Sequence, residues 1–518
     1  MKVVFVHLDL GIGGAEMLVV NAAVAAQEAG HEVRVYTSHH DPRRCFGETT
    51  GKGALAGTVR VGGDWLPRDL FGKFTALCAI VRYLPRLWMM DCIFRVRTIS
   101  QLTSAHDDGN LGPRLATIRS ILLPKRKFEV CALLRAPSMR CVDVIFCDGV
   151  SAPVPLLRVV APVLFYCHFP DKLLCVARDS LWKRVYRWPL DMVEELTTGC
   201  ATCVAVNSNF TAGIFQEAFP RIGKNYSPSG TGDEFMTGAW HGGNGRRGTA
   251  RAQVSGRGNG KLRVLYPPTN VASYPERGPE DAIPEGRMGA VVSLNRFERK
   301  KNLPLAIMAV GWAIKEMGAD QASSDRGLRL IIAGGYDERV AENMEHLEEL
   351  KKLTCELGLE RVVEFRPNIG DEERSSLLRK ASCVLYTPSR EHFGIVPVEA
   401  MCSEAPVIAV NSGGPLETIV DGRTGFLCPP TEETFGSAIV EIASAPGLAL
   451  SMGKEGRQRV KERFSMESFA QAFDASLVDV AETGRRASQR WLVRAGFAVL
   501  AALPVAWMKL GGAKGFDA

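Results

Sequence analysis

Two glutamates, Glu391 and Glu399, stand eight positions apart in the C-terminal half of the chain. The apolar residues 384–386 before them predict a buried strand, and a helix is expected to begin between the two glutamates. Glu391 then lies in a loop, where its carboxylate would face a reacting sugar. Glu399 lies one to two turns into the helix and could accept hydrogen bonds from the two hydroxyls of a ribose. The simpler alternative is a helix cap followed by a surface glutamate.

The start of that helix is itself an expected anion site. The backbone N–H groups of Phe393, Gly394 and Ile395 would point at a phosphate, and the helix dipole would favour its negative charge. Together with the two glutamates, this segment predicts a site for a nucleotide diphosphate.

Basic residues gather in the segment Asn295-Arg-Phe-Glu-Arg-Lys-Lys301-Asn302, which follows a predicted strand at 290–294. The guanidinium of Arg296 could fork onto a phosphate, and Lys301 could add a point charge. Together they could neutralise a departing diphosphate. A basic cluster alone is more often a solvated turn, so this interpretation depends on the helix start described above.

A glycine loop, Gly11-Ile-Gly-Gly-Ala-Glu16, follows the first predicted strand at 3–6. Gly13 and Gly14 are the residues expected to approach a donor phosphate. The loop is not the dinucleotide fingerprint G-x-G-x-x-G, because position 16 is a glutamate. This disfavours a dehydrogenase, and the absence of G-x-x-x-x-G-K-[ST] argues against a P-loop NTPase.

His168 closes an apolar strand predicted at 163–167. There it could hydrogen-bond a sugar hydroxyl or a phosphate, or act as a base; a structural histidine is the alternative. A second loop, 411–417, contains two consecutive glycines and predicts close backbone approach to a ligand.

No metal site is predicted. The chain has no D-x-D motif, which metal-dependent sugar-nucleotide transferases use, and its single C-x-x-C, Cys200 to Cys203, lacks a second pair. We therefore expect Arg, Lys and a helix dipole, without a metal or other cofactor, to stabilise a leaving group.

The elements that carry these residues form two α/β series. In the first, strands are predicted at 3–6, 33–37, 144–147, 163–167 and 204–207. In the second, strands are predicted at 290–294, 328–333, 362–365, 384–386 and 407–409, with helices between them. Parallel sheets in tandem predict two Rossmann-like domains facing across a cleft. We place them at 1–264, with insertions at about 91–141 and 221–263, and at 265–480.

Composition narrows the class further. The chain has 518 residues, of which 46% are hydrophobic, a fraction typical of globular proteins and too high for a disordered one. Its net charge of +6 is too small to predict nucleic-acid binding.

Residues 491–508 form an apolar stretch that could span a bilayer as a C-terminal helix, which makes 485–518 a candidate membrane anchor. The flanking arginines would leave the large N-terminal part in the cytosol. An apolar helix packed on a domain is the alternative, and 76–94 is a candidate interfacial segment.

These residues together resemble the family-4 glycosyltransferases of the GT-B fold. The resemblance is carried by Gly13-Gly-Ala-Glu16, by Arg296 with Lys301, and by the E-x7-E pair of Glu391 and Glu399. Longer runs, such as HLDLGIGGAEMLV, LFYCHFPDKLL, NRFERKKNLPLA and LYTPSREHFGIVPVEAM, are similar to the bifunctional α-1,3/α-1,6-mannosyltransferases of dolichol-linked oligosaccharide assembly in asparagine-linked glycosylation. The similarity covers roughly residues 1–90, 142–220 and 262–475 and is lost in the two insertions.

The resemblance implies GDP-mannose as donor and a dolichyl-diphosphate chitobiose carrying one mannose as acceptor. It implies two retaining additions, first α-1,3 and then α-1,6, on the cytosolic face of the endoplasmic reticulum membrane. Glu391 and His168 would act at the transferred mannose, and residues 265–480 would bind the GDP-sugar while 1–264 takes the acceptor side. Association with other dolichol-pathway transferases is a further expectation. The acceptor-binding residues are not predicted.

Two alternatives stay open from the residues alone. One is a GT-B glycosyltransferase with another donor or acceptor, because donor specificity is not readable from Glu399 and Arg296. The other is a membrane-anchored scaffold without enzymatic activity.

Overall fold

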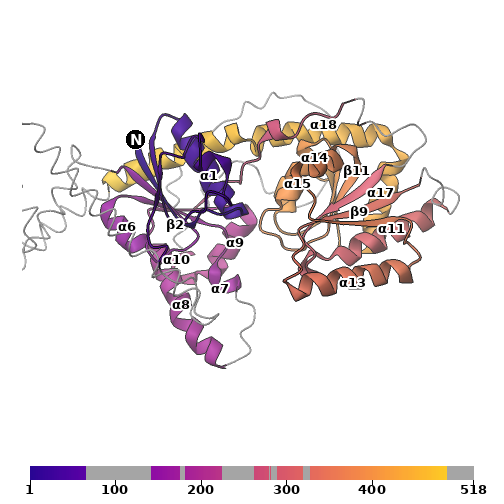
Figure 1. Cartoon of the computed structure of the whole chain (residues 1–518), viewed down its shortest axis with the longest axis horizontal. Coiled ribbons are helices and arrows are strands. Elements are labelled where there is room, and N and C mark those ends of the chain that lie inside the picture. The colour runs from indigo at the N-terminus through magenta and orange to yellow at the C-terminus, as the bar shows by residue number, and fades with distance from the viewer. Residues whose placement is uncertain are drawn as a thin grey trace, which may run out of the picture. The chain divides into compact units, whose positions relative to one another are not determined.

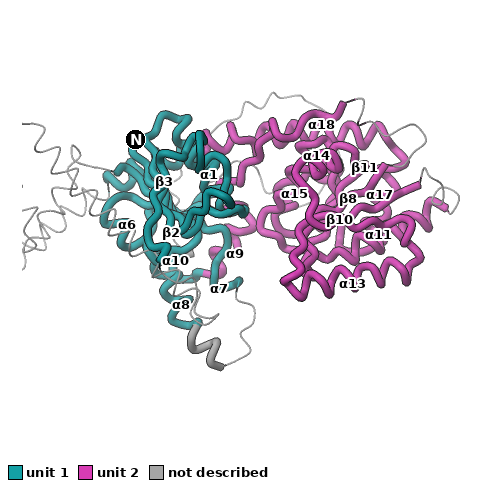
Figure 2. Tube along the Cα trace, in the orientation of Figure 1, with its two compact units in different colours: residues 1–205, 219–263, 473–518 teal, residues 206–218, 264–472 magenta. Residues whose placement is uncertain are grey.

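The computed structural model describes residues 1–65, 142–174, 181–223, 262–278, 281, 289–318 and 327–486, without the side chains of 181–186 (Figure 1). The chain separates into two compact units, which Figure 2 distinguishes by colour. Unit 1 comprises residues 1–205, 219–263 and 473–518, and unit 2 comprises 206–218 and 264–472. Several predicted features lie outside the described residues: the apolar segments 76–94 and 491–508, the insertion 91–141, and most of the insertion 221–263.

The described part of unit 1 is built on a parallel sheet that starts with the apolar run after Met1. The strand order is β3-β2-β1-β4-β5-β6-β7, with β1 at Lys2–Asp9, β2 at Glu32–His39, β3 at Val59–Val61, β4 at Val144–Asp148, β5 at Val163–Cys167, β6 at Cys203–Val206 and β7 at Leu262–Val264. The helices described here are α1 (Gly14–Glu28), α6 (Val154–Val160), α7 (Asp171–Leu174), α8 (Leu181–Gly199) and α10 (Pro220–Gly223), with a 3-10 turn η1 (Gly47–Thr49).

Residues from Phe473 onward also belong to unit 1, whereas the sequence analysis ended the second domain at residue 480. The ring of Phe473 packs 6.2 Å from that of Phe5 and 5.4 Å from that of Phe146, measured between centroids. A hydrogen bond of 2.7 Å joins Nε2 of His31 and Oδ1 of Asp474. The helical segment after α18 therefore completes the core of the first sheet.

Unit 2 carries a second parallel sheet, in the order β10-β9-β8-β11-β12-β13. Its strands are β8 (Ala290–Leu294), β9 (Arg329–Gly334), β10 (Val363–Pro367), β11 (Ala381–Tyr386), β12 (Val407–Val410) and β13 (Gly425–Cys428). Counted from β8, this is the 3-2-1-4-5-6 order of a Rossmann sheet. The helices and turns are α9 (Asn209–Ala218), η5 (Val271–Ser273), η7 (Arg299–Lys301), α11 (Leu303–Met317), α13 (Ala341–Glu356), α14 (Asp371–Lys380), α15 (Ile395–Cys402), α16 (Pro415–Thr418), α17 (Glu432–Ser444) and α18 (Pro446–Arg463). The predicted α/β class with two Rossmann-like domains is confirmed.

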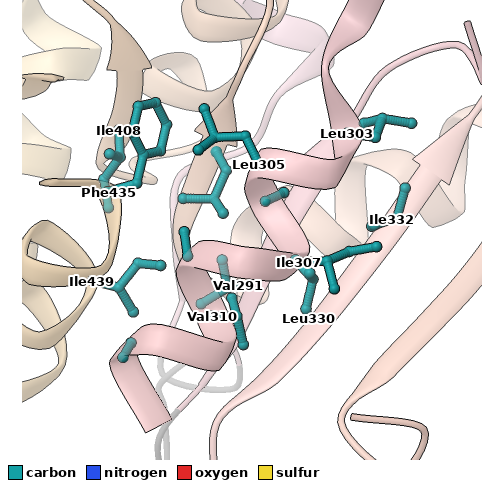
Figure 3. Packing of buried hydrophobic residues seen from close by; sticks show 14 of the residues in the cluster. Val291, Leu303, Leu305, Ile307, Val310, Leu330, Ile332, Ile408, Phe435 and Ile439 are labelled. Atoms are coloured by element: carbon teal, nitrogen blue, oxygen red, sulfur yellow. The ribbon is translucent and has the colours of Figure 1, made fainter. Parts of the chain in front are cut away.

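Alternating side chains of the second sheet fill two separate cores. On β8, Val291 joins the cluster under α11 and α17, and its neighbour Val292 joins the cluster under α15 and α18. On β9, Leu330 and Ile331 divide in the same way. Figure 3 shows the first cluster, in which α11 packs along the sheet. Each fully buried side chain of this size contributes about 1.5–3 kcal/mol, so the strands are fixed on both faces and their ends are held in place.

Within the described part of the chain, no single helix has the length and apolar character needed to cross a membrane. Helices α17 and α18 meet the length and composition criteria only when taken together, and they are bent by 103° at the break between them.

Candidate active site

The order of the unit 2 strands reverses between β8 and β11, which lie side by side. Ligands of open parallel sheets bind at the carboxyl ends of the strands at such a reversal. The loop after β8 carries the predicted basic cluster, and the loop after β11 carries the first predicted glutamate. The two segments therefore meet at one edge of the sheet, although they are about 90 residues apart in the chain.

Lys301 and Glu391 are brought into direct contact there. Lys301 ends the turn η7, after which Asn302 takes a left-handed conformation with a φ of 48°. The Nζ of Lys301 lies 2.5 Å from Oε1 of Glu391, and both side chains are partly exposed. The hydroxyl of Thr387 donates to the carbonyl oxygen of Lys301 at 2.7 Å, which ties the two loops together. A positive charge is thus held beside a carboxylate at the strand ends.

The helix start predicted near Gly394 is present as the beginning of α15. Gly394 is its N-cap with a φ of 79°, a conformation that a residue without a Cβ adopts without strain. The side chain of Phe393 is buried and stacks on Tyr266, with ring centroids 5.8 Å apart. Phe393 therefore anchors the loop in the core, and Ile395 opens the helix with a side chain that is 38% exposed.

Glu399 lies in α15 and has partners that the sequence analysis missed. The hydroxyl of Tyr274 donates to its Oε1 at 3.0 Å, and Arg374 from α14 donates to its Oε2. Burial raises the pKa of Glu399, while the charge of Arg374 opposes that rise. Tyr274 and Arg374 thus fix the direction of this carboxylate.

The glycine loop at 411–417 supports the backbone around Glu391. The N–H of Gly414 donates to the carbonyl oxygen of Glu391 at 2.8 Å. A Cβ on Gly413, whose φ is 73°, would stand 2.4 Å from that same oxygen, and a Cβ on Gly414 would stand 2.2 Å from the carbonyl oxygen of Phe393. The close approach expected for these glycines is therefore an approach to the protein's own backbone.

Arg296 differs from Lys301 in its surroundings. Its side chain is 72% exposed, and its Nη1 lies 3.5 Å from Oε1 of Glu298. The guanidinium is therefore a solvent-accessible cation just beyond the end of β8.

In unit 1 the strand order reverses between β1 and β4, and three titratable side chains meet there. Asp148, the last residue of β4, lies between two histidines. Its Oδ2 is 2.9 Å from Nδ1 of His7 on β1, and its Oδ1 is 2.9 Å from Nε2 of His168, just after β5. The side chain of Asp148 is fully buried, and that of His168 is 28% exposed. Of these three residues, only His168 was predicted from the sequence.

A fourth group joins this cluster from the first glycine loop. Oε1 of Glu16, in the first turn of α1, lies 3.7 Å from Nε2 of His7. A Cβ on Gly13 would stand 2.2 Å from the Glu16 carboxylate, whereas one on Gly14 would meet no atom within 4 Å. Gly13 thus leaves room for Glu16, and the predicted phosphate loop is joined to the histidines.

The protonation of His7 and the ionisation of Asp148 depend on each other. Burial opposes protonation of His7, but the carboxylates of Asp148 and Glu16 outweigh it and raise its pKa to about 9. Burial opposes ionisation of Asp148, yet the two histidines hold its pKa well below the usual range. Near neutral pH, His7 is therefore the cation that compensates the buried Asp148 carboxylate. Across the described residues, no group of three or more His, Cys, Asp or Glu is arranged to hold a metal ion.

Similarity to known proteins first defines the class to which this protein belongs. Residues 284–459 match the family described as "Glycosyl transferases group 1". The fold is similar to that of a glycosyltransferase from Rickettsia africae, with a TM-score of 0.55 and 13% identity over 92% of this chain and 98% of the other. With two Rossmann-like units, the chain is a glycosyltransferase of the GT-B class.

Relatives of higher identity narrow the class. The human α-1,3/1,6-mannosyltransferase ALG2 is 40% identical over 91% of this chain and 94% of its own length. The enzyme of the same name from Rhizomucor pusillus is 38% identical over 93% and 92%, respectively. The chain belongs to the ALG2 family of α-1,3/1,6-mannosyltransferases. An enzyme is therefore favoured over a scaffold without activity.

Proposed function

We propose that this protein transfers mannose from GDP-mannose to a dolichyl-diphosphate chitobiose that carries one mannose. It adds an α-1,3 mannose and then an α-1,6 mannose, in the synthesis of the N-glycan precursor. Family membership supports the two linkages, and the choice of donor and acceptor is an inference from the same relationship. The observation that carries the chemical part of the proposal is the Lys301–Glu391 pair at the strand reversal of unit 2.

The donor diphosphate would bind beside this pair. Lys301 and Arg296 would neutralise the charge that develops as GDP leaves, and the N–H groups at the start of α15 would add a partial positive charge. Lys301 is suited to this because its ammonium is already fixed by Glu391 and needs little rearrangement when substrate binds. The carboxylate of Glu399 would accept the ribose hydroxyls, in the direction that Tyr274 sets.

The transferred mannose would lie between the diphosphate and the incoming hydroxyl. Glu391 would hold mannose hydroxyls, since its carboxylate is at the strand ends and partly exposed. His168 would hydrogen-bond the sugar or accept a proton, and Gly13 and Gly14 would approach the phosphates. Because donor and product linkages are both α, the acceptor hydroxyl would attack on the face that the diphosphate leaves.

We assign the nucleotide-sugar to unit 2, which corresponds to the domain predicted at 265–480, and the acceptor to unit 1, which corresponds to the domain predicted at 1–264. The acceptor is lipid-linked, so we place the enzyme on the endoplasmic reticulum membrane with its catalytic domains in the cytosol, together with other transferases of the dolichol pathway. Residues 485–518 are the proposed anchor. Removing them should release the protein from microsomal membranes, and full retention would point to residues 76–94.

Nucleotide binding tests the donor assignment directly. Isothermal titration with GDP, UDP and ADP, each without added metal, should give the tightest binding for GDP in the wild type. Lys301→Ala should weaken GDP binding at least tenfold. Tighter binding of UDP would overturn GDP-mannose as donor and favour a GT-B enzyme of different specificity.

A further inference from the structure

Four titratable side chains form an unbroken series in unit 1, from the first helix to the end of β5. Glu16 contacts His7 at 3.7 Å, His7 contacts Asp148 at 2.9 Å, and Asp148 contacts His168 at 2.9 Å. Exposure is greatest at the two ends, where the side chains of Glu16 and His168 are 24% and 28% exposed. The middle pair is buried, with 7% for His7 and none for Asp148.

Such a series has a direct consequence for His168. A buried carboxylate on Nε2 favours the tautomer that carries its proton there, which places the lone pair of the neutral ring on Nδ1. The ring is also fixed from one side by Tyr166, whose centroid lies 4.8 Å away in an edge-on arrangement. The charge that His168 meets is set by Asp148, and the neutralisation of Asp148 depends on His7.

We propose that Glu16, His7 and Asp148 are positioning residues for His168, and that they set its tautomer and the charge that its ring faces. Glu16 keeps His7 cationic, His7 compensates Asp148, and Asp148 holds the imidazole. Because Glu16 is part of the first glycine loop, a change of that loop on binding a phosphate would alter the charge balance at His168. This inference rests on the proposed role of His168 at the transferred sugar.

Other titratable groups lie close enough to this series to interact with it. Burial raises the pKa of Tyr166 and of Cys167, both on β5, and the charge of Asp148 raises each of them further. His7 faces both carboxylates, Asp148 and Glu16.

Glu16→Gln is the most informative variant, because it keeps the size of the side chain and changes its charge at a partly exposed position. Without that carboxylate, His7 should lose its proton at lower pH. We therefore expect the alkaline limb of the pH profile of kcat to move down by about one unit, with kcat about twofold lower at pH 8 and about fivefold lower at pH 9. Asp148→Asn should lower kcat about 100-fold, within the range for a misplaced acid–base group.

His31→Gln is the matched control. It removes a histidine that also pairs with a carboxylate in unit 1, Asp474 at 2.7 Å, but lies at the other end of the strands, before β2. We expect its kcat and pH profile to stay within twofold of the wild type. Melting temperatures of all variants separate loss of function from loss of fold.

A second readout does not depend on activity. Histidine 15N resonances report the tautomer and protonation of each ring, and His168→Gln assigns the His168 signal. In Glu16→Gln and in His7→Gln, the titration of His168 should shift by at least half a pH unit. An unchanged His168 titration would overturn the series itself, and a shifted titration with unchanged kinetics would overturn its role. If the wild type fails to use GDP-mannose, the proposed function is wrong, and the NMR result still decides whether the series exists.

Discussion

Lys301→Ala removes the ammonium that the structure places at the reversal point of the unit 2 sheet. The side chain is 16% exposed, its Nζ lies 2.5 Å from Glu391, and its backbone carbonyl is fixed by Thr387. The neighbouring Lys300 offers a matched comparison in the same turn. Its side chain is 68% exposed, and its Nζ pairs with Glu298 at 3.0 Å. The two lysines thus differ in exposure and in ion-pair partner, although both belong to η7.

Lys301→Ala is expected to have a small effect on stability and a large effect on kcat. A partly exposed ion pair contributes about 1 kcal/mol to stability at most, which lowers the melting temperature of a unit of this size by about 2–4 °C. A fixed donor that meets developing negative charge contributes about 3–4 kcal/mol to the barrier, or 100-fold to 1000-fold in kcat. Lys301→Ala should therefore lose nearly all activity and almost none of its fold.

The assay compares initial rates of mannosyl transfer at saturating donor for wild type, Lys301→Ala and Lys300→Ala, with melting temperatures measured in parallel. We expect a loss of at least 100-fold for Lys301→Ala and less than twofold for Lys300→Ala. A rate for Lys301→Ala within threefold of the wild type, or an equal loss for Lys300→Ala, would refute the assignment of Lys301 to the departing diphosphate.

Three further predictions follow from the same structure. Tyr274→Phe removes the donor to Glu399, so the KM for the nucleotide sugar should rise about fivefold with kcat within twofold, as steady-state kinetics would reveal. Gly414→Ala places a Cβ 2.2 Å from a carbonyl oxygen beside Glu391, so transfer should fall at least tenfold and the melting temperature should drop. Glu194, which accepts backbone N–H groups at the start of α7, has its pKa raised to about 7 by burial, so its ionisation opposes folding. Between about pH 4.5 and 7 the native state holds the extra proton. Stability should therefore fall as pH rises through this window by on the order of 3 kcal/mol, and Glu194→Gln should flatten that slope in denaturant titrations.

The sequence was most informative where a short apolar run ends in a polar residue. Val384–Tyr386 and Ala290–Leu294 are recognisable strands, and their neighbouring places in a Rossmann sheet bring Lys301 to Glu391. The predicted helix after Gly394 starts one residue later, at Ile395. Periodicity and turn chemistry act locally, so these features needed no knowledge of the tertiary fold.

Contacts between distant segments were not predictable in this way. Tyr274 and Arg374 meet Glu399 from 125 and 25 residues away, and no local pattern marks them. Asp148 could have been predicted, because it follows an apolar strand as His168 does. A search for polar residues at strand ends would have found both. Helices α17 and α18 were not predicted. In α18, many charged residues accompany a buried stripe, and that stripe is evident only from the packing of the helix on α15.

The proposed transfer is tested by incubating the purified full chain with GDP-mannose and a lipid-linked diphosphate carrying Man-GlcNAc₂, and measuring the product mass. We expect the gain of two mannoses without added metal, and linkage analysis should give one α-1,3 and one α-1,6 bond. The absence of any mannose gain, in folded protein that transfers sugar from a uridine nucleotide instead, would contradict it.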